Sequence, residues 1–270
     1  MAGRGAGRGR AAVSIASGSD ASPTSGRGRG RGSVVSSPLL PRAPTTLSDV
    51  VSEIQKIRAS ESEPLPPILI HKCVSFTRGS GTNEQLVQTI FEAVYDNRER
   101  AEPLAILSST LSSDGDNLIG KPFRNALLSH SQSQYNQRKE LRLRSVEVWL
   151  CMISFLSYLF KYLKAGGQPI RALSGPLSVC FSDILSGDDI SDDEIDCVCD
   201  LLRNVGSAIA QSSSEQDVQL IKLVRDKILA SSTSNRARCL LLELLEFRAA
   251  GWTGKEEANR FYADTLGDMH

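Results

Sequence analysis

The chain has 270 residues and a formal net charge of zero, but residues 1–44 carry seven Arg and one acid, so a basic head precedes a mildly acidic body. The length allows one or two domains. The charge split predicts that the basic head binds a polyanion and that the acidic body binds a different class of partner. The N-terminus lacks the apolar region of a secretory signal and the six Cys lack zinc-type spacing, which argues against a secreted protein or a zinc module and favours reduced thiols in an intracellular compartment.

Residues 1–44 are of low complexity, with Arg interleaved with Gly in "GRGAGRGRAA" and "SGRGRGRGS". Such a segment cannot bury enough apolar area to offset the entropy of ordering it, so we expect a disordered tail. Arginine offers charge and a planar face that stacks on bases, so the tail is a candidate for weakly sequence-selective, salt-dependent RNA binding. The alternative is a flexible, methylatable tail without a dedicated ligand. The candidate RNA-binding residues are Arg4, Arg8, Arg10, Arg27, Arg29 and Arg31.

From residue 45 onward, apolar residues recur at helical spacing, starting after Thr46, and no stretch alternates like a strand. Residues 64–81 contain three prolines and later Gly and Ser breakers, so we expect them to be partly irregular. Further helices are expected over 85–95, 103–111, 121–140, 143–164, 169–185, 192–210, 215–229, 234–250 and 255–266.

Four of these helices begin with a capping box, in which the first residue accepts a backbone hydrogen bond and the fourth reaches back. The pairs are Thr82 with Gln85, Ser191 with Glu194, Ser212 with Glu215 and Thr253 with Glu256. About ten helices of moderate length with short links predict antiparallel helix pairs stacked on one another over residues 45–270.

The most membrane-like run, residues 146–163, keeps polar residues on one side of its helical wheel. A lipid-spanning helix would not keep such a stripe without neighbours to cover it. We therefore interpret this run as a core helix of a helical bundle with one face turned outwards. The polar side consists of Glu147, Ser154, Tyr158 and Lys161.

The segment "CLLLELLEFRAAGW", residues 239–252, is leucine-rich over most of a helical wheel. Such a helix is typical of the middle of a stack, and Glu243 and Glu246 then mark its one exposed edge, a candidate partner-binding surface. Gly251 fits the left-handed position of a Schellman motif, which predicts a contact between Phe247 and Trp252.

One single arginine and one cluster of basic residues are further candidates for partner binding. Arg248 lies inside the leucine arc, so it either pairs with an acid on a neighbouring helix or contacts a partner at the helix end. The basic cluster, Arg138, Lys139 and Arg142, continued by Arg144, lies at the predicted junction of two helices. It is either a solvated face or a surface for RNA phosphates or an acidic peptide.

No catalytic, cofactor-binding or metal-binding constellation is evident in the sequence. The three His are scattered, and His130 shares a helical face with Phe123 and Leu127, so a core or boundary imidazole is favoured over a base. No P-loop, nucleophile elbow or dinucleotide turn is present. The acidic run at 188–196 lacks the glycine and terminal Glu of a calcium loop, and a capping box with acids in a first helical turn explains it.

The segment 239–252 closely resembles a helix near the C-terminal end of the middle domain of eukaryotic initiation factor four-gamma, the MIF-four-G domain. The resemblance continues in the family's order through "PFRNALLSHSQSQYNQRKELRLRS", "VWLCMISFLSYLFKYL", "EIDCVCDLLRNVG" and "LIKLVRDKIL", and covers about residues 46–266. It is strongest to the small single-domain members. It implies an all-α, HEAT-like, right-handed stack of about five antiparallel helix pairs.

The resemblance also implies a non-enzymatic adaptor that bridges an mRNA-end-binding protein to the translation machinery. Implied partners are the histone stem-loop-binding protein, DEAD-box helicases and initiation factors, with a homodimer plausible because of aromatic residues near 158, 162 and 261–262. One alternative is a regulator that contacts the poly(A)-binding protein or the cap complex, because the Arg/Gly head is similar to that of such relatives. Another is a protein that binds RNA directly through its tail, and an enzyme is the third.

Overall fold

The computed structural model describes residues 45–57, 65–79, 81–113, 119–165 and 167–267. These ranges contain twelve α-helices and a single pair of two-residue strands, so the expected all-α class is confirmed. The predicted tail, residues 1–44, lies outside the described residues, and so do all six of its candidate arginines.

The first six helices are short to moderate in length. They are α1 (Leu47–Gln55), α2 (Pro67–Arg78), α3 (Asn83–Asp96), α4 (Ala101–Ser113), α5 (Lys121–Asn136) and α6 (Arg138–Arg144). The remaining six include the longest of the described chain. They are α7 (Val146–Tyr162), α8 (Ser174–Leu185), α9 (Asp192–Ser212), α10 (Ser214–Leu229), α11 (Asn235–Ala249) and α12 (Glu256–Gly267).

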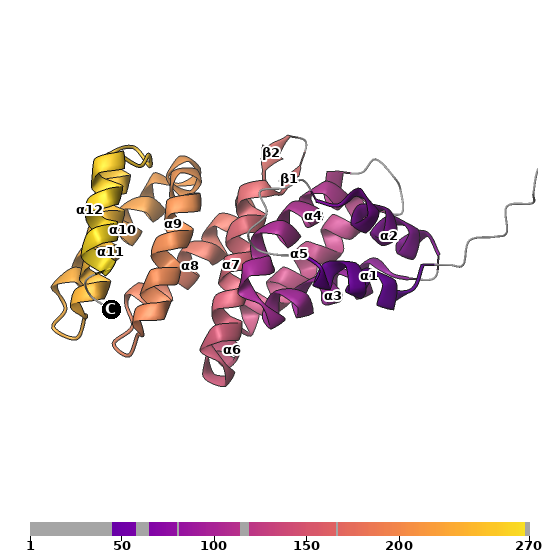
Figure 1. Cartoon of the computed structure of the whole chain (residues 1–270), viewed down its shortest axis with the longest axis horizontal. Coiled ribbons are helices and arrows are strands. Elements are labelled where there is room, and N and C mark those ends of the chain that lie inside the picture. Colours follow the sequence, from indigo (N-terminus) through magenta and orange to yellow (C-terminus); the bar gives the residue numbers. More distant parts are fainter. Residues whose placement is uncertain (1–44, 58–64, 80, 114–118, 166, 268–270) are drawn as a thin grey trace, which may run out of the picture. The chain divides into compact units, whose positions relative to one another are not determined.

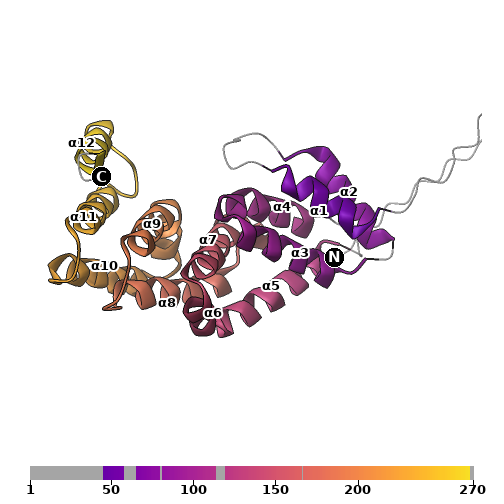
Figure 2. The same ribbon diagram turned by 60° about the horizontal axis from the view of Figure 1, so that its bottom comes forward.

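The helices pack as neighbouring antiparallel pairs in chain order. Contacts run from α4 to α7, from α7 to α9, from α9 to α11 and from α11 to α12, which makes one layer. The contacts of α3 with α5 and of α8 with α10 belong to the other layer. Figures 1 and 2 show the same order, with α9 and α11 side by side in both views. This is the HEAT-like stack that the sequence predicts.

Helix α7 lies at the centre of the apolar core. Eleven of its side chains are almost completely removed from water, among them Trp149, Phe155 and Phe160, because α4, α9 and α6 pack around it. The expected polar stripe is partly wrong: Ser154 is only 3 % exposed and lies 3.7 Å from the Cys197 sulfur on α9. Across the described ranges, we find no helix with the length and hydrophobicity needed to cross a membrane.

The structure corrects several expected element boundaries. Residues 67–78 form α2, because Pro67 occupies the first helical position, where a missing N–H is harmless. The expected helix 121–140 is interrupted at Gln137, which divides it into α5 and α6. The expected helix 169–185 begins only at Ser174, after a two-residue strand pair, β1 (Lys164–Ala165) and β2 (Gln168–Pro169).

Two of the four expected capping boxes are confirmed. Thr82 with Gln85 caps α3 and Ser191 with Glu194 caps α9, each with both reciprocal hydrogen bonds. The box at Ser212 is wrong, because α9 runs through that residue and Ser213 caps α10. The box at Thr253 is also wrong: its hydroxyl donates to the Ala250 carbonyl at 2.7 Å, and α12 begins at Glu256.

Candidate partner-binding surface

The end of α11 sets the position of the candidate site. Gly251 has a φ of +77°, the Trp252 N–H donates to the Phe247 carbonyl at 2.9 Å, and the Gly251 N–H donates to the Arg248 carbonyl at 2.9 Å. These are the two hydrogen bonds of a Schellman motif. The rings of Phe247 and Trp252 meet edge to face, with centroids 6.3 Å apart, so the predicted clasp is confirmed.

Trp252 fixes this turn against α9. A Cβ atom placed on Gly206 would lie 2.1 Å from the indole, so only glycine at this position lets the ring pack so closely. The chain then returns along α11 as α12. The turn and the two helices together form one side of the stack, the α11–α12 groove.

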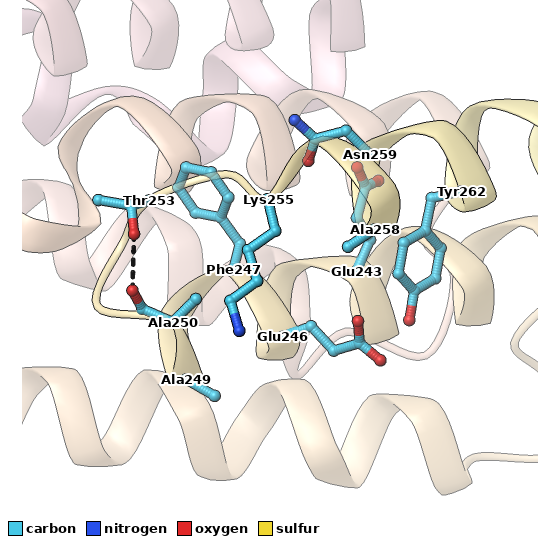
Figure 3. A pocket seen from close by; sticks show the side chains of 10 residues that line it. All are labelled: Glu243, Glu246, Phe247, Ala249, Ala250, Thr253, Lys255, Ala258, Asn259 and Tyr262. Carbon is cyan, nitrogen blue, oxygen red and sulfur yellow. Dashed lines mark hydrogen bonds between the residues drawn. The ribbon is translucent and has the colours of Figure 1, made fainter.

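The α11–α12 groove has a volume of about 310 Å³ and is visible in Figure 3. Its walls are apolar and its rim is charged. The lining residues are Glu243, Glu246, Phe247, Ala249, Ala250, Thr253, Lys255, Ala258, Asn259 and Tyr262.

The two carboxylates of the groove have different roles. The sequence predicts both on an exposed edge, which is correct for Glu246 and wrong for Glu243, whose side chain is 17 % exposed and forms an ion pair with Arg203 of α9. Burial raises the pKa of Glu243, and Arg203 offsets part of that rise. Glu246 is therefore the carboxylate that a ligand can reach.

Tyr262 lines the groove from α12, and its hydroxyl points towards Glu246 (Figure 3). It is 6 % exposed, so the expectation that it adds to an exposed aromatic surface is wrong, whereas its neighbour Phe261 is 62 % exposed. Burial and the facing Glu246 carboxylate raise the pKa of Tyr262 to about 12. The hydroxyl thus stays protonated at neutral pH and donates to the Glu246 carboxylate.

Arg248 has a structural role, because it pairs with an acid on α10. Its guanidinium bonds both carboxylate oxygens of Asp217 on α10, at 3.2 Å and 2.5 Å, and this bidentate pairing raises the pKa of Arg248. Asp217 is 8 % exposed, so the arginine compensates a buried charge. Of the two roles considered for Arg248, the pairing with an acid on a neighbouring helix is the one observed.

The basic cluster at α6 is largely neutralised within the chain. Arg138 pairs with Asp183 at 3.2 Å, and Arg142 pairs with the buried Glu194 at 2.9 Å. Lys139 remains exposed. Sequence reasoning missed these acids because they are 45 and 52 residues away along the chain.

Other chemistry-bearing residues have structural surroundings. His130 is half-buried, with its ring 4.5 Å from the ring of Phe91, as expected for a boundary imidazole. The six cysteines are free thiols in buried positions. Within the described part of the chain, no group of three or more His, Cys, Asp or Glu residues is placed to hold a metal ion.

Comparison with known proteins assigns the family. The model of the MIF4G domain family matches residues 69–250. The chain is 38 % identical over 148 residues to MIF4G domain-containing protein A of Danio rerio. The aligned segment covers 54 % of this chain and 68 % of that protein. Identity to the human MIF4G domain-containing protein is 34 % over 148 residues, or 54 % and 67 % of the two chains.

A MIF4G domain is a helical protein-interaction module of translation factors and is not a known enzyme fold. The domain match spans more than half of the chain, and it includes α11 with the α9 and α10 residues that hold it. This protein therefore belongs to the MIF4G domain family.

Proposed function

We propose that this protein is a non-enzymatic adaptor in mRNA translation or metabolism. In this role it holds a segment of an mRNA-end-binding protein, such as the histone stem-loop-binding protein, and connects it to initiation factors or to a DEAD-box helicase. Family membership carries the proposal, because MIF4G domains mediate protein–protein interactions in translation factors. We place this activity in the cytoplasm and the nucleus.

The α11–α12 groove is our candidate for the adaptor's docking site. It combines apolar walls with one exposed carboxylate, Glu246, and a protonated tyrosine hydroxyl from Tyr262. A short partner segment could place an aliphatic side chain against Phe247 and a cation against Glu246. Apolar walls beside a charged rim suit the binding of a short segment, which is the chemistry that we propose for this groove.

Blocking the groove tests the proposal directly. Ala258→Trp fills the groove from α12, whereas Ala263→Trp places the same side chain on an exposed position of α12 that does not line it. We expect the first variant to weaken binding of purified stem-loop-binding protein, helicase or initiation factor at least tenfold, and the second to leave it unchanged. Calorimetric titration of the full chain measures both, and equal affinities would remove the groove from the proposal.

The Arg/Gly composition of residues 1–44 favours a second candidate function, direct RNA binding. Deleting these residues separates the two candidates. An adaptor keeps its partner-protein affinity and loses only RNA affinity, with a shallower salt dependence. The adaptor proposal fails if partner-protein binding disappears with the tail while the circular dichroism spectrum shows that the helices remain folded.

A regulator that contacts the poly(A)-binding protein or the cap complex is the remaining alternative among adaptors. Titrating those two proteins in the same calorimetric series distinguishes it. We also propose that the protein can form a homodimer through exposed aromatic surface such as Phe261. Sedimentation equilibrium of the full chain and of Phe261→Ser measures that association.

A further inference from the structure

We propose that a second surface, beside α6, binds a short basic segment of a partner protein through an apolar anchor side chain. This surface is distinct from the α11–α12 groove and goes beyond the adaptor function proposed above. We call it the α6 groove. Residues of α6, the start of α7, the α8–α9 turn and the start of α9 line it.

The α6 groove is a hollow of about 760 Å³ whose lining combines apolar and charged side chains. Leu150 and Ile190 belong to the apolar core or pack against it. Leu143 is 88 % exposed and Val146 is 39 % exposed, and both line the same hollow. Leucine on a surface is ordinary, but exposed apolar residues bordering a hollow are typical of an interaction site.

A smaller hollow of about 340 Å³ adjoins the first and shares Leu143 and Arg142 with it. Trp149 lines this second hollow and is 1 % exposed. Its indole nitrogen has no hydrogen-bond acceptor among the residues that the structure describes. A buried N–H without an acceptor is unusual, and it marks the wall between α6 and α7 as the part of this surface whose hydrogen bonding is incomplete.

The charge of the α6 groove is acidic. Five carboxylates and one base, Arg142, line it. Arg142 is already engaged, because it pairs with Glu194 at 2.9 Å and donates to the Asp189 carbonyl at 3.1 Å. The side chains of Asp188, Asp189 and Asp193 are exposed and form no ion pair within the described ranges. The groove therefore presents these three carboxylates to a ligand, together with the exposed Glu147, which accepts from the Cys151 thiol but is in no ion pair of the described ranges.

The fold does not need these three carboxylates for capping. Glu194 completes the capping box with Ser191 at the start of α9, and Asp192 accepts from the Ser234 hydroxyl at 2.8 Å. The acids next to these positions are thus left for another partner. Inside the α6 groove, RNA phosphates or an acidic peptide would meet repulsion from these carboxylates.

The occupant that fits is a peptide segment with two or more cations flanking a branched aliphatic side chain. The cations lie opposite Asp188, Asp189 and Asp193, and the aliphatic side chain packs against Leu143, Val146 and Leu150. Charge steers such a segment to the groove, and burial of the anchor retains it.

The test uses the full chain and a fluorescein-labelled twelve-residue peptide built around Arg-Arg-Leu-Val-Arg. We expect saturable binding that is weakened at least tenfold by the double substitution Asp188→Lys and Asp189→Lys. Leu143→Ser should weaken it by a similar factor, because it removes the apolar contact. A peptide with Glu in place of each Arg should not bind.

Matched controls keep the outcome specific. Leu229→Ser alters a leucine that is 83 % exposed on α10, and Asp226→Lys with Asp264→Lys reverses two exposed acids outside the groove. These controls should retain the affinity of the unaltered chain. Thermal unfolding of every variant shows whether the stack is intact, and all of the altered positions are exposed.

Three results would overturn the inference. One is the absence of saturable binding by the basic peptide. Another is equal weakening by the groove variants and the control variants. The third is occupation of the groove by another ligand. A second copy of the chain is that ligand if Leu143→Ser abolishes a dimer in sedimentation, and RNA is that ligand if an oligonucleotide displaces the peptide. Ala258→Trp should leave peptide binding unchanged, which separates this surface from the α11–α12 groove.

Discussion

Helices α6 and α11 have similar compositions, but they differ in how many of their leucines are buried. Each is rich in Leu and Arg, as "RKELRLR" and "RARCLLLELLEFR" show. Helix α11 packs against α9, α10 and α12, so most of its leucines are buried and its acid and base, Glu243 and Arg248, pair with neighbouring helices. Helix α6 packs mainly on α7 and α5, and Leu143 is left 88 % exposed.

The difference shows how the number of packed neighbours assigns a role to the same residue types. Where three helices surround a leucine, burial contributes about 1.5–3 kcal/mol to folding. Where few helices reach it, the same side chain is left at a surface that can bind a partner. Substitutions in and around the two helices test this contrast.

Truncating a leucine in each helix should give opposite results. Leu241→Ala on α11 removes a side chain that is 0 % exposed, and we expect a loss of about 2–5 kcal/mol in the free energy of unfolding because a cavity remains. Leu143→Ala on α6 should change it by less than about 0.5 kcal/mol. Urea titration followed by circular dichroism measures both. Similar losses would mean that α6 is packed as tightly as α11.

The close approach of Trp252 to α9 gives the next largest effect. Gly206→Ala forces the indole away, and we expect a loss of about 1–3 kcal/mol. Trp252→Leu lowers stability by itself but should abolish most of the additional effect of Gly206→Ala in the double variant. Additive losses in this double-mutant cycle would show that the ring is not what requires glycine at 206.

Arginines of the two helices provide a smaller contrast. Arg248→Met leaves Asp217 buried without its cation, so we expect a loss of about 1–3 kcal/mol. Arg144→Met, at an exposed position at the end of α6, should be close to neutral. Thermal melts at two salt concentrations check this. If Arg248→Met changed the melting temperature as little as Arg144→Met does, Arg248 would have no structural role.

The pH dependence at His130 should be the smallest effect. Burial lowers the pKa of His130 below its usual value of 6.5, although Glu92 opposes the shift. Gln134 accepts from the Tyr95 hydroxyl through its oxygen, so its amide nitrogen donates to His130 Nε2, which suits a neutral ring. The unfolded chain then binds more protons just below pH 6.5, and stability falls as the pH drops through that range.

Substitution of His130 checks the sign of that dependence. We expect His130→Gln to flatten the fall of stability below about pH 6.5 relative to the unaltered chain. Urea unfolding at half-unit pH intervals gives the two profiles. Identical slopes would mean that other groups carry the dependence.

Much of the local structure could be predicted because its causes are local. The Schellman motif at Gly251 depends on one left-handed residue and two apolar side chains within six positions, so "EFRAAGW" suffices to specify it. The capping boxes at Thr82 and Ser191 likewise need only four residues. The capping boxes predicted at Ser212 and Thr253 are wrong because a four-residue pattern does not contain the packing that extends α9 through Ser212 and starts α12 only at Glu256.

The candidate sites were less predictable. Glu246 was identified correctly as an exposed carboxylate, but Glu243 was not, because its partner Arg203 is 40 residues away. The sequence also gives α6 a basic character, whereas in space Arg138 and Arg142 meet carboxylates from α8 and α9. Asp188, Asp189 and Asp193 then set the sign of that surface.

The sequence by itself determined that the described part of residues 45–267 would be mainly helical, where most helices begin and how α11 ends, because periodicity, caps and glycine conformations act within a few residues. Only the tertiary structure decided which charges are neutralised and which leucines are covered. Those outcomes depend on helices that are far apart in the chain and become neighbours only when the pairs stack. The surface left for partners is what this packing does not use.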